Sequence, residues 1–182
     1  FSIGKALDKT SIFKEDVMKQ VVSVKTMLNF GFLGYKASEN KYSYPRLTED
    51  KVLALFRAVM EIADYSIIDC TSDSDDLISR MAMTEADSVV QMITPDIKCM
   101  GYYSSQADIY NSVADRSIKV LCICDRDLYL PTDEVKAHFK NIAYTLPYSR
   151  PLKQQVITGT LSERLADRKY REQIAEIAKK VV

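Results

Sequence analysis

The sequence contains no tryptophan, a single histidine and only five glycines among its 182 residues. With five glycines and five prolines it has no Gly/Ser-rich linker or low-complexity stretch, and no internal repeat is visible. The only histidine, His138, has no nucleophile or acid at catalytic spacing, so we interpret it as a partly exposed helix residue. These scarcities argue against repeat architectures and against a histidine-centred active site.

Long hydrophobic runs are also missing. The longest apolar segments fall far short of the roughly 20 residues that span a bilayer, and the first residues lack the basic start and apolar stretch of a secretory signal. Basic and acidic side chains number 25 each, so no overall field attracts the protein to nucleic acid or to an acidic membrane surface. We expect a cytoplasmic protein without a transmembrane segment.

Cysteine is scarce and its placement argues against a disulfide framework. Cys70, Cys99, Cys122 and Cys124 fall inside apolar segments, which suits small buried thiols in a reducing compartment. Cys122-x-Cys124 places two thiols on one side of a strand, but with His138 alone and no second cysteine pair nearby it does not resemble a zinc site. We therefore predict buried core thiols.

Hydrophobic patterning predicts a single α/β domain over residues 1–182, a length that buries a proper core. Short β-branched apolar runs alternate with longer helical patterns, as in strand–helix units around a mainly parallel β-sheet. Most of these runs are apolar on both faces, which predicts helices flanking both faces of the sheet. The predicted strands are Leu28 to Leu33, Ser66 to Cys70, Ser88 to Ile93, Ile118 to Cys124 and Asn141 to Thr145.

Helical patterns occupy most of the intervals between these runs. A helix is predicted after Thr48, which has the features of an N-cap, and its apolar stripe comprises Val52, Leu55, Phe56, Val59 and Met60. Further helices are predicted from about Asp75 to Thr84, Ile97 to Val113 and Thr132 to Phe139, and from near Asp167, where Tyr170, Ile174, Ile177, Ala178 and Val181 recur at helical spacing. The interval from Tyr35 to Leu47 is predicted to be a surface loop.

An aspartate at the end of a predicted strand is the first candidate site residue. The segment Ala63 to Thr71 reads as a buried strand that delivers Asp69 to the sheet edge where ligands of open α/β folds bind. In P-loop ATPases such an aspartate holds Mg²⁺, usually through water, because this hard ion prefers oxygen ligands. The alternative is that Asp69 caps the turn after the strand.

Three segments, taken together, resemble the ParA/MinD-type ATPases of the wider CobQ/CobB/MinD/ParA group. ADYSIIDC resembles the strand that carries the Mg²⁺-site aspartate, and EADSVVQMITPDIKCM resembles the next strand with its Thr-Pro-Asp-like exit. FKNIAYTLPYSRPLKQQVITGTL resembles the late strand, its Leu/Ile-Pro-Tyr turn and the helix that follows. Order and spacing match over roughly residues 50 to 182. The resemblance implies a P-loop NTPase-like three-layer sandwich with ATP and Mg²⁺ as cofactors.

Carried over to this sequence, the resemblance assigns roles to residues near the phosphates and the metal. Asp69 would be the Mg²⁺-associated acid, and Thr71, with Cys70 before it, would begin the loop that senses the γ-phosphate. The acidic residues Asp73, Asp75 and Asp76 follow closely enough to share the metal, although carboxylates at a helix N-terminus are the preferred interpretation.

The resemblance also places residues beside the base. The turn containing Pro147 and Tyr148 would lie beside the adenine. Asp125-Arg126 stands where the family often has an Asn-Arg pair whose amide reads the base. Because a carboxylate accepts hydrogen bonds but cannot donate one as an amide does, adenine recognition is in question here, and the alternative is that Asp125 and Arg126 pair with each other.

The Gly-rich, Lys-containing loop that cradles the triphosphate in this family does not occur in the sequence. The only Gly-Lys, Gly4-Lys5, is followed by Ala6 and has no glycine before it. We therefore expect neither tight ATP binding nor hydrolysis from these residues alone, and no catalytic residue is assigned. Either the first strand, loop and helix precede Phe1, which the missing initiator methionine favours, or the chain is a degenerate relative.

Two functions remain open. The first is an ATP-dependent molecular switch that forms a homodimer around Mg·ATP and binds DNA or a partition-protein partner, in plasmid or mobile-element partitioning or in positioning a cellular complex. The second is a nucleotide-free interaction module that retains the fold, which the missing loop and Asp125 support. Activity as an ATPase depends on an upstream P-loop. A Rossmann dehydrogenase is disfavoured because no Gly-x-Gly-x-x-Gly follows any predicted strand.

Overall fold

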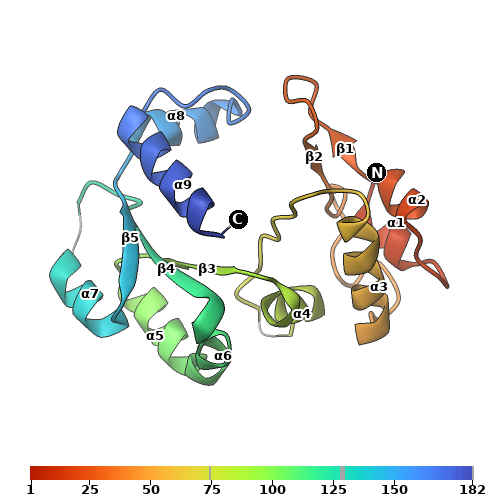
Figure 1. Ribbon diagram of the computed structural model, residues 1–182, viewed down its shortest axis with the longest axis horizontal. Coiled ribbons are helices and arrows are strands. Elements are labelled where there is room, and N and C mark those ends of the chain that lie inside the picture. The colour runs from red at the N-terminus through yellow and green to blue at the C-terminus, as the bar shows by residue number, and fades with distance from the viewer. Residues whose placement is uncertain (74, 128–129, 182) are drawn as a thin grey trace. The chain divides into compact units, whose positions relative to one another are not determined.

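The computed structural model describes residues 1–73, 75–127 and 130–181. Contacts divide the chain into two compact units, Phe1–Glu85 and Ala86–Val182, and each has its own sheet and its own hydrophobic core (Figure 1). No helix among the described residues is long and apolar enough to cross a membrane.

The second unit, Ala86–Val182, is built on a three-stranded parallel sheet of order β3-β4-β5. Its strands are β3 (Val89–Ile93), β4 (Ser117–Cys122) and β5 (Ile142–Leu146). They confirm the three predicted strands that start at Ser88, Ile118 and Asn141, because runs of β-branched residues pack well on a pleated surface and the helices between them allow parallel crossovers.

Helices cover both faces of this sheet. Neighbouring residues of β4 point to opposite sides, so Leu121 packs with Val135 and Phe139 of α7 (Thr132–Phe139), whereas Val120 packs with Ile177 of α9 (Arg168–Val181). Side chains of α5 (Ile97–Ser105) join the α7 face. Figure 1 shows α5 and α7 on one side of the strands and α9 on the other. The predicted fold class, α/β with a parallel sheet flanked by helices, is confirmed.

The helices of this unit agree with the sequence prediction except in detail. The segment predicted as one helix from Ile97 to Val113 forms two, α5 and α6 (Ala107–Ser112), because Gln106 leaves helical geometry with φ −111° and ψ 17°. A short 3₁₀ helix (Ala114–Arg116) and α8 (Arg150–Thr158) complete the unit. On α9, Ile177 is buried as predicted, whereas Ile174 is 44% exposed.

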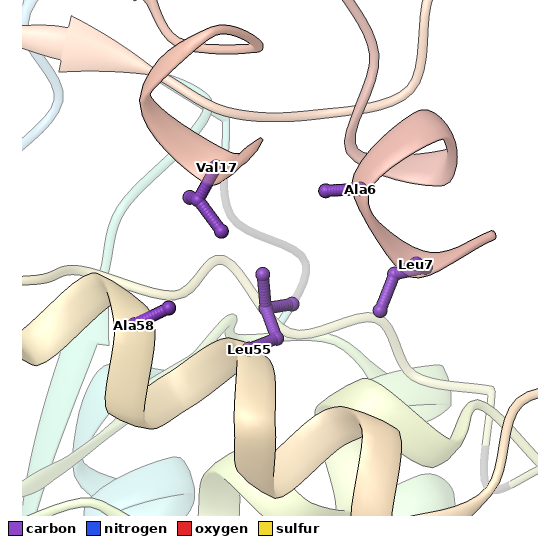
Figure 2. Close-up of a cluster of buried hydrophobic side chains, with 5 residues drawn as sticks. All are labelled: Ala6, Leu7, Val17, Leu55 and Ala58. Carbon is purple, nitrogen blue, oxygen red and sulfur yellow. The ribbon is translucent and has the colours of Figure 1, made fainter. Parts of the chain in front are cut away.

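The first unit, Phe1–Glu85, packs three helices around a small core. Its elements are α1 (Ile3–Leu7), α2 (Lys14–Met18), α3 (Glu49–Met60), α4 (Leu77–Glu85) and an antiparallel pair of β1 (Val22–Ser23) and β2 (Gly31–Phe32). Figure 2 shows the side chains of Ala6 and Leu7 from α1, Val17 from α2, and Leu55 and Ala58 from α3 pointing toward one another. The helix predicted after Thr48 is confirmed.

Parts of the sequence prediction for the first unit need correction. Thr48 is the N-cap residue of α3 as predicted, although its hydroxyl makes no capping hydrogen bond. Met60 of the predicted apolar stripe is 68% exposed. The strand predicted from Leu28 to Leu33 shortens to Gly31–Phe32. The loop predicted from Tyr35 to Leu47 is confirmed, since no helix or strand lies within it.

The predicted strand Ser66 to Cys70 is wrong. The segment belongs to neither sheet, and Ile67 is 95% exposed. A strand exists only when its backbone N–H and C=O groups pair with another strand, and among the described residues none pairs with this segment. Its apolar, β-branched composition is therefore not sufficient to form a strand here.

Candidate functional site

A surface cavity of about 390 Å³ opens at the carboxyl ends of β4 and β5. Strand β4 leads into Asp125, Arg126 and Asp127, strand β5 leads into Tyr148, and α8 contributes Lys153, and these five residues line the cavity. The carboxyl ends of parallel strands meet at one edge, which is where ligands of open α/β sheets bind. The structure thus brings together three of the sequence-derived candidates, Asp125, Arg126 and Tyr148.

Asp125 forms an ion pair with Lys153, whose Nζ lies 3.0 Å from Oδ1 of the carboxylate. The hydrogen bond that Lys153 donates to Asp125 and the negative charge of Asp125 are the main reasons why the pKa of Lys153 is raised, so the ammonium group keeps its proton. Lys153, rather than Arg126, is the partner that the structure gives Asp125, which corrects the suggested Asp125–Arg126 pair. Both side chains are more than half exposed, so the pair contributes little to stability and mainly orients the carboxylate.

Tyr148 provides an aromatic ring close to two cations. The guanidinium carbon of Arg126 and the Nζ of Lys153 each lie 5.8 Å from the centre of the Tyr148 ring, a separation at which a cation is attracted to the face of the ring. The backbone after Tyr148 is fixed because the Ser149 hydroxyl caps α8, accepting from the Leu152 N–H at 3.3 Å. Pro147, the remaining candidate of this turn, is half-buried.

Lys153 and Asp127 were not among the sequence-derived candidates. A signal for Lys153 is present, because Ser149 followed by Pro151 is typical of a helix start and puts Lys153 in the first turn after the strand end. Asp127 follows Asp125 by two residues and carried no signal of its own.

Two thiols lie just before this cavity. The Sγ atoms of Cys122 and Cys124 are 3.7 Å apart, and burial, followed by the charge of Cys124, raises the pKa of Cys122 to about 12. A thiol with that pKa is protonated at neutral pH and is therefore a weak nucleophile. All four cysteines are free thiols in the structure. The prediction of buried core thiols is wrong for Cys70 and Cys124, which are exposed.

The phosphate and metal candidates lie in the first unit. Asp69 is exposed and follows an extended segment rather than a strand. Thr71 is held in place by two hydrogen bonds, one from its N–H to the Ser79 hydroxyl at 3.0 Å and one from the Asp73 N–H to its own hydroxyl at 2.8 Å. No group of three metal-ligating side chains occurs among the described residues.

The neighbouring acidic residues have structural partners. Asp76 accepts from the Ser79 N–H at 2.8 Å in the first turn of α4. Asp73 pairs with Lys41, and that hydrogen bond is the main cause of the lowered pKa of Asp73. The preferred interpretation, carboxylates at a helix N-terminus, is therefore confirmed for Asp76.

His138 is exposed on α7, as predicted from the sequence. Its ring packs edge-on against Phe139, with the ring centres 5.0 Å apart.

Comparison with known proteins identifies the fold. No protein-family model matches the sequence, and no curated protein matches it. Among solved structures, the chain is similar to a ParA family ATPase from Chlorobium tepidum TLS, with a TM-score of 0.74 and 16% sequence identity over 97% of this chain and 73% of that chain. At this identity the likeness shows the fold alone, which is ParA-like and P-loop NTPase-like.

Proposed function

We propose that this chain belongs to a nucleotide-dependent molecular switch that works as the ParA/MinD-type ATPases do. The observation that supports the proposal is the cavity at the carboxyl ends of β4 and β5, which combines an aromatic ring, two cations and two carboxylates in a ParA-like fold. The switch forms a homodimer around Mg·ATP and binds DNA or a partition protein in that state. Plasmid or mobile-element partitioning and positioning of a cellular complex both fit this cycle.

The residues at the cavity fit a nucleoside better than they fit an extended partner. A volume of about 390 Å³ lies within the range of roughly 300 to 1,000 Å³ typical of small-molecule sites. The Tyr148 ring, next to Pro147, offers a flat face for a base, and Arg126 and Lys153 supply positive charge beside it. ATP is the nucleotide that the resemblance implies, although Asp125 departs from the family's amide where the base would lie.

Asp69 and Thr71 are the proposed contacts for the metal and the γ-phosphate. Asp69 has an exposed carboxylate, which is the kind of oxygen ligand that Mg²⁺ uses together with water and phosphate oxygens. Thr71 has a defined conformation, because its N–H donates to the Ser79 hydroxyl and its own hydroxyl accepts from the Asp73 N–H. The proposal treats residues 1–182 as one nucleotide-binding domain whose phosphate-binding loop is not in this sequence.

A nucleotide-free interaction module is the second candidate function. The absence of a Gly-rich, Lys-containing loop from the sequence favours it, because that loop cradles the triphosphate in P-loop ATPases. Such a module keeps the sheet and its helices and uses exposed surfaces to bind a partner.

The test must detect weak binding, with a Kd on the order of 1 mM, where the binding free energy is about −4 kcal/mol. Two-dimensional NMR of the ¹⁵N-labelled chain, titrated with Mg·ATP, should shift the amide signals of Asp125, Arg126, Tyr148 and Lys153. Light scattering on the same samples should show a nucleotide-dependent dimer. Unchanged spectra and an unchanged mass would favour the interaction module instead.

A variant pair tests the metal role. Asp69→Ala should abolish the Mg²⁺ dependence of binding, because it removes the proposed metal-associated carboxylate. Asp64→Ala is the matched control, since Asp64 is also an exposed aspartate on the same extended segment. Equal effects of the two substitutions would remove Asp69 from the proposed site.

A further inference from the structure

The cavity at the ends of β4 and β5 has the hydrogen-bonding groups to distinguish one purine from another. One such group is the Asp125 carboxylate, whose side chain is 69% exposed and whose Oδ1 accepts from Lys153 at 3.0 Å. A second carboxylate, Asp127, lines the same cavity. The two carboxylates supply hydrogen-bond acceptors for a ligand that presents donors, and Arg126 and Lys153 supply donors beside them.

Guanine and adenine differ in the number of donors on the edge that a base presents for pairing. Guanine carries a ring N–H and an amino group side by side, with a carbonyl oxygen next to them. Adenine carries an amino group beside a ring nitrogen that only accepts. An ionised carboxylate is acceptor-only with two oxygens, so it can bind both guanine donors at once, whereas the adenine ring nitrogen faces its second oxygen without a proton between them.

We propose that this cavity selects guanine over adenine. This inference rests on the proposed nucleotide-binding function and replaces the adenine nucleotide with a guanine nucleotide as the preferred ligand. Asp125 accepts from the guanine ring N–H and the amino group, and Lys153, already beside Oδ1, donates to the guanine carbonyl oxygen. The Tyr148 ring stacks on the base. Arg126, whose guanidinium carbon lies 5.8 Å from the centre of the Tyr148 ring, is the second cation of the cavity besides Lys153. Guanine thus uses both carboxylate oxygens and the ammonium group, whereas adenine can use one oxygen and the ammonium group.

The Asp125–Lys153 pair also explains why the carboxylate is suited to this task. The ammonium group of Lys153, whose pKa is raised by its hydrogen bond to Asp125, donates to Oδ1 at 3.0 Å and leaves the second carboxylate oxygen of Asp125 without a partner in that pair. An asparagine in its place would offer one acceptor and one donor group, which matches the amino group and ring nitrogen of adenine. The identity of residue 125 therefore determines which purine fits.

The test compares GMP, IMP and AMP, which share ribose and phosphate and differ only in the base. The ¹⁵N-labelled chain is titrated with each, and Kd values are taken from the shifts of Tyr148 and Lys153. Binding of GMP should be roughly tenfold tighter than that of AMP, since one additional hydrogen bond to a charged group accounts for about that factor. IMP, which lacks the 2-amino group, should bind more weakly than GMP.

A substitution then tests Asp125 directly. Asp125→Asn should reverse the order, so that AMP binds more tightly than GMP, while Asp108→Asn, a change at an exposed aspartate of α6 outside the cavity lining, should leave the order unchanged. The GMP-to-IMP comparison in the unmodified chain needs no variant and stands even if Asp125→Asn impairs folding.

The outcomes separate this inference from the proposed function. If AMP binds as tightly as GMP, or IMP as tightly as GMP, the guanine preference is wrong and nucleotide binding stands. If none of the three nucleotides shifts the signals of the cavity residues, both the preference and the proposed nucleotide site are wrong.

Discussion

Gln91 lies in the middle of β3 with its side chain buried, 6% exposed, and neither its amide nitrogen nor its amide oxygen has a hydrogen-bond partner among the described residues. In the strand register it stands opposite Lys119, whose Nζ donates to the Phe139 carbonyl at 2.8 Å. A buried polar atom without a partner has lost its bonds to water and gained none in return. We expect this glutamine to destabilise the second unit.

The substitution Gln91→Met removes both polar atoms and keeps a side chain of similar length. Each unpaired polar atom costs roughly 1–3 kcal/mol, and local relaxation recovers part of that, so we expect the free energy of unfolding to rise by about 1–3 kcal/mol. For a chain of this length, each kcal/mol raises Tm by roughly 2–4 °C. Urea unfolding followed by circular dichroism should show a higher midpoint with an unchanged slope.

Gln154→Met is the matched control, because Gln154 is exposed on α8 and its side chain is not buried. Its free energy of unfolding should change by no more than about 0.5 kcal/mol. If Gln91→Met leaves stability unchanged or lowers it, the Gln91 amide is satisfied in solution, for example by water, and the reasoning from its missing partners fails.

Three further measurements test other parts of the structure. Phe139→Ala should lower the free energy of unfolding by about 3–5 kcal/mol in urea titrations, because Phe139 is 2% exposed and its ring packs edge-on against another aromatic ring; a loss below about 1 kcal/mol would contradict its place in the core. The pKa of Asp96 is lowered in the folded protein, mainly by the hydrogen bond from the Thr94 hydroxyl. The ionised Asp96 carboxylate therefore stabilises the fold fully above the pKa that Asp96 has in the unfolded chain, and this stabilisation is lost as pH falls through the lower pKa of the folded protein. The free energy of unfolding should consequently fall less steeply on acidification in Asp96→Asn. Iodoacetamide at pH 8 should modify the exposed Cys124 well before the half-buried Cys122, because burial raises the pKa of Cys122 to about 12. Peptide mass spectrometry would measure the two rates of modification, and equal rates would contradict the burial of Cys122.

The candidate site was predictable where local sequence fixes the backbone. Asp125 and Tyr148 each follow a β-branched run that forms a strand, so the sequence placed both at the carboxyl edge of a parallel sheet. The two residues line one cavity because β4 and β5 are paired neighbours in that sheet. The ion pair between Asp125 and Lys153 was not predictable in the same way. It depends on the direction in which α8 leaves the sheet, which is a property of packing rather than of the sequence near Lys153.

The sequence by itself determined the α/β class, the three strands of the second unit and the helix Thr132–Phe139, because hydrophobic periodicity and β-branched content act over a few neighbouring residues. Only the tertiary structure decided that Ser66 to Cys70 remains outside any sheet, since a strand needs a partner distant in sequence. The exposure of Cys124 and the unmet hydrogen bonds of Gln91 were likewise settled by packing. Local sequence specifies which segments can be strands or helices, and the pairing and burial of those segments depend on contacts that no local pattern encodes.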